Sequence, residues 1–204
     1  GVTAVRLTNP AVDLHELPAL DCILLSHYHE DHFDQKVEKS LNRTFPIITT
    51  PHAKRCLTGL KNEPFQRVTG LDFFESVMLH IEEDPERESG DVKAAVRVTG
   101  MPGKHVPPGP LAAANDWLKA VPPTNGWLVE LGHTKNTSTG ADADELETGY
   151  RIYISGDTLL VDELNEIPKR LQNDKIDLML VHLGGTTIPG PKMPMIMVTM
   201  DAEQ

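Results

Sequence analysis

One short segment holds the densest group of side chains that could do chemistry. The eight positions from His27 to Asp34 contain three histidines and three acids, in the order His-Tyr-His-Glu-Asp-His-Phe-Asp. Neutral imidazole nitrogens and carboxylate oxygens are good ligands for zinc and related divalent metals. His27 and His29 are two residues apart, so on an extended segment both side chains project to the same side and can reach one ion. Asp31 and His32 follow where the chain turns, and the spacing therefore predicts a second ion beside the first.

The alternative for this segment is a set of exposed histidines near the start of a helix. In that interpretation Asp31 is only a favourable negative charge at the N-terminal end of the helix. An uninterrupted His-x-His-x-Asp-His string directly after an apolar run is more typical of a metal site than of a surface.

The elements around the string alternate between strand and helix patterns. Residues 21–26 form an apolar run that predicts a buried strand, and the β-rich residues 45–50 predict the next strand. Apolar residues spaced four apart predict a helix over 33–41. Pro51 can begin a second helix over 52–60. This alternation is typical of an α/β fold.

Later segments predict further strands, one more helix and two irregular stretches. Residues 101–110, with four prolines and two glycines, predict irregular structure. The polar segment 132–149 predicts a surface insertion. A helix is predicted over 159–171, with Pro168 as its break. The predicted strands lie at 73–81, 92–99, 127–131, 150–155 and, as an apolar strand, 176–183.

Composition limits the function classes. A net charge of −11 over 204 residues argues against nucleic acid as a partner, because phosphate binding needs a positive field. No apolar segment approaches the ~20 residues needed to span a bilayer, so we expect no integral membrane segment. Cys22 and Cys56 are too few for a disulfide framework and predict reduced thiols in a cytoplasmic protein. Composition does not indicate an oligomeric state.

The string His27-Tyr-His-Glu-Asp-His32 resembles the signature of the metallo-β-lactamase superfamily. Members of that family fold as αββα sandwiches with metals at one edge, between the two sheets. The resemblance implies that His105, in the Pro- and Gly-rich segment, is the third histidine of the first metal site. It also implies that Asp157, in Ser155-Gly-Asp-Thr, bridges two ions after a tight turn at glycine. Capping of the following helix is the alternative for Asp157.

The resemblance thus gives two ligand sets within one α/β domain over 1–204. It implies an αββα metallo-β-lactamase-type sandwich that is incomplete at both termini. The family's β-hairpins before the histidine string are lacking, and its last histidine would follow the segment that resembles Met197–Glu203. His52 and His182 are candidates for contacts with substrate or with the metal ligands, and a structural or exposed role is equally compatible with their positions. The first set consists of His27, His29, His105 and Asp157, and the second of Asp31, His32 and Asp157.

The segments Ser26–Asp34, Thr50–His52 and Asp177–Gly185 resemble one branch of the family. That branch contains the ascorbate-6-phosphate lactonases and the N-acylphosphatidylethanolamine-hydrolysing phospholipase D enzymes. The resemblance implies a zinc-dependent hydrolase, with two zinc ions per complete domain and with manganese or iron as compatible metals. Its metal-activated water would attack a small ester, lactone or phosphodiester substrate, with Asp31 also orienting or deprotonating that water. The alternatives are a catalytically degenerate binding module and an iron-dependent redox protein with the same ligands.

Overall fold

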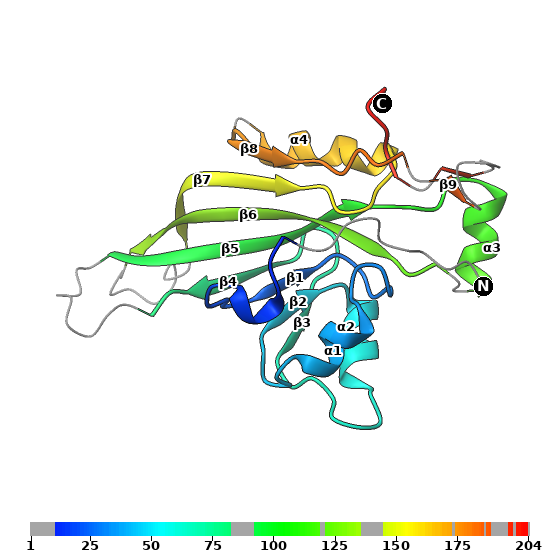
Figure 1. Ribbon diagram of the computed structural model, residues 1–204. Helices are drawn as coiled ribbons and strands as arrows, with labels where there is room; N and C mark the ends of the chain where they lie inside the picture. The colour runs from blue at the N-terminus through cyan, green and yellow to red at the C-terminus, as the bar shows by residue number, and fades with distance from the viewer. Residues whose placement is uncertain are drawn as a thin grey trace.

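A computed structural model describes most of the chain as two facing sheets with helices on their outer faces (Figure 1). The described residues are 11–82, 92–118, 121–135, 145–172, 174–185, 187–188, 196–197 and 199–203. The order of layers is helix, sheet, sheet, helix. The predicted αββα sandwich is therefore confirmed.

The first sheet is parallel and has three strands in the order β1 (Ile23–Leu25), β2 (Ile47–Thr49) and β3 (Val68–Gly70). Helix α1 (Gln35–Ser40) follows β1, and α2 (Pro51–Thr58) follows β2. Helix α2 begins at Pro51, as predicted, whereas α1 begins two residues after the predicted start at residue 33. The Asp34 carboxylate accepts backbone N–H groups at the start of α1, and Thr50 accepts one at the start of α2, as N-cap residues do.

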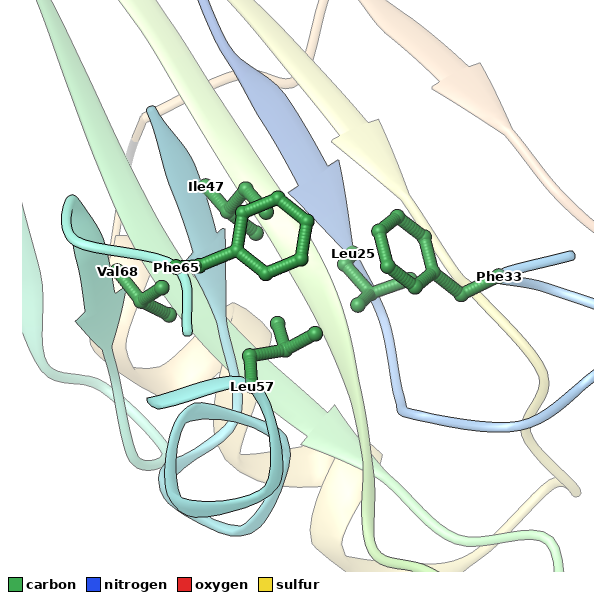
Figure 2. Packing of buried hydrophobic residues seen from close by; sticks show 6 residues of the cluster. All are labelled: Leu25, Phe33, Ile47, Leu57, Phe65 and Val68. Carbon is green, nitrogen blue, oxygen red and sulfur yellow. The ribbon is translucent and has the colours of Figure 1, made fainter. Parts of the chain in front are cut away.

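A hydrophobic cluster holds α2 and the segment just before α1 against the outer face of the first sheet (Figure 2). Leu57 of α2 is fully buried in this cluster, and Phe33, just before α1, is 5% exposed. Phe33 lies outside the helix and is buried by packing in this cluster, with its ring centroid 6.2 Å from that of Phe65. The buried members are Leu25, Phe33, Ile47, Leu57, Phe65 and Val68.

The second sheet has five strands in the order β4-β5-β6-β7-β8. Strands β4 (Ser76–His80), β5 (Val92–Gly103), β6 (Thr124–Lys135) and β7 (Leu146–Ile154) are antiparallel, and β8 (Leu178–Leu180) runs parallel to β7.

Strands β5 to β7 extend beyond their predicted bounds. The prediction of irregular structure was wrong for residues 101–103, since the β5–β6 ladder continues to Gly103 opposite Thr124. Helix α3 (Pro110–Leu118) then starts at the last proline of that segment, where a missing N–H is tolerated. Both ends of the surface insertion predicted over 132–149 are paired with each other as parts of β6 and β7. Residues 136–144 lie outside the described residues.

Apolar residues alternate between the two faces of the second sheet. Val98 and Trp127 face the first sheet and pack with Ile48 and Leu71. The opposite face packs on the turn η2 (Asp162–Asn165) and helix α4 (Glu166–Leu171). The prediction that Pro168 breaks this helix was wrong. Pro168 lies in the first turn of α4, where backbone N–H groups have no intrahelical acceptor.

Strand β8 is the outer strand of the sheet as the structure describes it. The apolar strand predicted over 176–183 is present as β8 but spans fewer residues. Its residues Leu178, Met179 and Leu180 are 40%, 56% and 50% exposed. A strand at a sheet edge has a neighbour on one side only, which leaves its side chains more accessible. The remaining elements are η1 (Leu14–Glu16) and the antiparallel pair β9 (Thr187–Ile188) and β10 (Ile196–Met197). None of the helices in the described ranges has the length and apolarity to cross a membrane.

A charged row crosses the helix-covered face of the second sheet. Glu130 of β6 lies directly opposite Arg97 of β5 and Arg151 of β7, with guanidinium Nε atoms 2.6 and 3.0 Å from its carboxylate oxygens. Glu130 is only 4% exposed. Burial would raise its pKa, but the hydrogen bonds and charges of Arg97 and Arg151 outweigh burial and hold the pKa of Glu130 below its usual range.

Candidate metal centre

The candidate site lies where the loops after β1, β5 and β7 meet. His27 follows β1, His105 follows β5 and Asp157 follows β7. The backbone N–H of Asn125 donates to the carbonyl of Ser26 at 3.0 Å, which ties the histidine string to β6. The two sheets therefore contribute jointly to the site.

Two hydrogen bonds join the His105 loop to the Asp157 loop. The N–H of Lys104 donates to Oγ1 of Thr158 at 3.0 Å. The N–H of Leu159 donates to the carbonyl of Lys104 at 2.7 Å. These contacts place His105 and Asp157 side by side although they come from different strands.

Gly156 makes the turn that presents Asp157. Its φ is +59°, and an added Cβ would lie 2.6 Å from the carbonyl oxygen of Asn125. A side chain at this position would meet both unfavourable backbone geometry and a steric clash. The turn therefore requires glycine.

Three buried residues form a compact group that could hold a metal ion. Ligand atoms of His27, His105 and Asp157 all lie within 4.8 Å of one another. Nδ1 of His27 lies 3.0 Å from the Ser26 hydroxyl, and Nε2 of His105 lies 2.9 Å from the carbonyl of Pro122. The second nitrogen of each ring remains available for an ion, and such partners commonly fix the orientation of metal-binding histidines.

Asp157 provides a direct test of whether these residues fit an ion. Its Oδ2 lies 3.0 Å from Nε2 of His32. Its Oδ1 is buried and has no hydrogen-bond partner within the described ranges, although Nδ1 of His182 makes an ion-pair contact with it at 2.5 Å. Both oxygens of Asp157 thus have imidazole nitrogens beside them. Two imidazoles and one carboxylate are ligand types that zinc accepts, so the donor set fits a metal.

The other members of the string surround this group. The ring centroid of His27 lies 4.2 Å from that of His32, 4.8 Å from that of His105 and 6.1 Å from that of His29. His29 and Asp31 are more than half-exposed, and Nδ1 of His29 contacts Oδ1 of Asp31. Oδ2 of Asp31 lies 3.9 Å from Nε2 of His32. The structure thus places His29, Asp31 and His32 beside the buried group, on its more accessible side.

Electrostatics favour the protonation states that bind metals. Burial, with the neighbouring His32 and His105, lowers the pKa of His27 to about 3. Burial also lowers the pKa of His105. For Asp157, burial would raise the pKa, but the hydrogen bond and charge of His32, with His182 and His27, lower it to about 2. At neutral pH the group therefore offers two neutral imidazoles and one carboxylate.

The two further candidate residues lie in different settings. His182 follows β8 and contacts Asp157. His52 lies on α2, with its Nε2 4.0 Å from Sγ of Cys56, and is not part of the compact group. A substrate contact for either residue stays a prediction.

Sequence reasoning missed the partners that orient the ligands. Ser26 adjoins the histidine string, and a hydroxyl beside a candidate ligand is a weak signal that could have identified it. Thr124, whose Oγ1 lies 3.4 Å from Nδ1 of His27, and the carbonyl of Pro122 carry no such signal, because only the fold brings them near.

Comparison with known proteins decides the family. Residues 2–204 match the family model described as "Beta-lactamase superfamily domain". The chain belongs to the beta-lactamase superfamily. This confirms the resemblance that the histidine string predicted.

Among solved structures, this beta-lactamase superfamily chain is similar to the isothiocyanate hydrolase from Delia radicum gut bacteria. The TM-score is 0.58 and the identity is 19%, over 95% of this chain and 59% of the other. The likeness supports the superfamily fold, and the chain spans 59% of the length of that protein. No curated protein sequence matches this chain significantly.

Proposed function

We propose that this protein is a zinc-dependent hydrolase that uses an activated water on a small ester, lactone or phosphodiester. The observation that carries the proposal is the buried group of His27, His105 and Asp157, whose ligand atoms lie within 4.8 Å of one another. Membership of the beta-lactamase superfamily supports the same reaction class.

The ligands would divide between two ions. His27, His29, His105 and Asp157 would hold the first, and Asp31, His32 and Asp157 would contribute to the second. Bound zinc would supply a Lewis acid that polarises the substrate and lowers the pKa of a bound water toward 7. Asp31 would accept a proton from that water or orient it, because its carboxylate is accessible and adjoins His29 and His32.

An open cleft of about 610 Å³ lies beside the group. His32, Asp157 and His182 form its polar side, and Ile154, Met179 and Val181 contribute apolar side chains. A cleft with a few polar groups and an apolar wall suits a small molecule that has an uncharged portion.

Zinc content and hydrolysis should be measured on the same preparations. We expect zinc to be retained by the wild type, as measured by elemental mass spectrometry, and to be lost from His105→Ala. His133→Ala is the matched control, because His133 lies in β6 and is exposed. The substrates should include a lactone, a carboxylic ester and a phosphodiester. An isothiocyanate should be added, because the structurally similar protein is named as an isothiocyanate hydrolase.

The outcomes separate the rival functions. Zinc binding with turnover that a chelator removes and added zinc restores would support the proposal. Zinc binding without turnover of any substrate would favour a degenerate binding module. Equal zinc content in wild type, His105→Ala and His133→Ala would show that the buried group does not hold the ion.

A further inference from the structure

His182 lies beside the compact three-residue group but does not belong to it. Its backbone N–H donates to Oγ of Ser155 at 2.9 Å, and that hydroxyl donates in turn to the carbonyl of Gly156 at 2.9 Å. Ser155 is 1% exposed. A buried hydroxyl therefore fixes the chain after β8 against the turn that presents Asp157.

The side chain of His182 contacts one oxygen of the Asp157 carboxylate. Nδ1 of His182 lies 2.5 Å from Oδ1, while Nε2 of His32 lies 3.0 Å from Oδ2. Each carboxylate oxygen thus has one imidazole beside it. The two imidazoles belong to segments that follow strands of different sheets. The side chain of Asp157 is 12% exposed and that of His182 is 46% exposed, so His182 lies on the solvent side of the carboxylate.

We propose that His182 is a positioning residue that limits rotation of the Asp157 carboxylate and so prepares it to bind an ion. The inference rests on the proposed function, because the orientation of Asp157 matters only if Asp157 binds metal. The terminal torsion of aspartate is broad when nothing restrains it. Contacts that orient a metal ligand commonly change metal affinity by about 10–100-fold when they are removed.

The competing assignment is direct ligation, and two substitutions separate it from positioning. His182→Asn keeps a polar N–H near the place of Nδ1 but removes the imidazole, which is the better zinc ligand. His182→Leu keeps bulk and removes every polar contact. If His182 positions Asp157, asparagine should rescue zinc affinity and leucine should not.

The test is a zinc titration of the metal-free protein in competition with a chromophoric chelator. For His182→Leu we expect a zinc dissociation constant raised about 10–100-fold with the stoichiometry unchanged. We expect His182→Asn to remain close to the wild type. His133→Leu, at an exposed position of β6, is the matched control and should not change zinc affinity.

Three results would overturn the inference, and they differ in what else they affect. Unchanged zinc affinity in His182→Leu would overturn it and leave the proposed function intact. Loss of one zinc equivalent in both His182→Leu and His182→Asn would identify a direct ligand. Failure of the wild type to bind zinc would overturn the inference together with the proposed function.

Thermal melting of the metal-free proteins checks for a structural effect. His182 is half-exposed, so its substitution should leave the metal-free melting temperature unchanged. If His182→Leu alone melts early, His182→Ala must show the same loss of zinc affinity for the inference to stand.

Discussion

Replacing Gly156 by alanine should destabilise the fold and weaken metal binding together. The φ of +59° costs a non-glycine residue about 1–2 kcal/mol. The added Cβ would lie 2.6 Å from the carbonyl oxygen of Asn125, and relief of such overpacking costs about 1–3 kcal/mol more. The free energy of unfolding should therefore fall by about 2–5 kcal/mol. For a chain of this size that corresponds to a melting temperature lower by about 4–20 °C.

The assay is thermal melting followed by circular dichroism, with zinc content measured on the same samples. Gly149→Ala is the matched control, because an added Cβ there would meet only the carbonyl oxygen of Leu131, at 3.8 Å. Its melting temperature should stay near that of the wild type. Because Asp157 follows Gly156 directly, we also expect Gly156→Ala to bind zinc more weakly. Equal melting temperatures for the two variants would refute the argument that this turn requires glycine.

Two further predictions concern the charged row and the metal itself. Glu130→Gln should lower the free energy of unfolding by about 1–3 kcal/mol, because two partly buried guanidinium groups lose their shared anion. The folded-state pKa of Glu130 is lowered, whereas its unfolded-state pKa is about 4.3. The charge of Glu130 therefore contributes fully to the free energy of unfolding above the unfolded-state pKa. That contribution is lost as pH falls through the folded-state pKa. Urea unfolding of the wild type and Glu130→Gln at pH 7 and pH 3 measures this pH dependence. A difference in the free energy of unfolding between the two proteins that does not shrink at pH 3 would contradict the prediction. Zinc at about 100 times its dissociation constant should stabilise the wild type by about 2.7 kcal/mol, and a melting temperature raised equally in His105→Ala would contradict that expectation.

Local sequence signals predicted the α/β alternation, whereas the αββα arrangement came from the family resemblance. A few neighbouring residues are enough to predict several elements. These are the strands β1 and β2 from their apolar runs, the start of α2 from Pro51, and the strands β4 and β5 from their alternation. The histidine string also carries its own signal, because ligand types at that spacing have few other uses. These features could therefore be found without knowledge of the fold.

Long-range contacts could not be predicted in the same way. The continuation of β5 to Gly103 depends on its partner β6, which overrides the local effect of proline and glycine. The low exposure of Glu130 depends on arginines in two neighbouring strands. Strand β3 is only three residues long and pairs with β2. In each case tertiary pairing, rather than local propensity, decides the structure.

The order in which the candidate ligands occur along the chain has a consequence for biosynthesis. His32 and Asp157 are 125 positions apart in sequence, and His27 and Thr124 are 97 apart. The histidine string therefore leaves the ribosome long before the carboxylate and hydroxyl that complete its surroundings. Strands β5 and β6 are near each other in sequence and can pair early. The site needs segments that are far apart in sequence to meet, and such long-range contacts form late. We expect a nascent chain to gain its buried metal-binding group only after β7 and the turn at Gly156 have emerged.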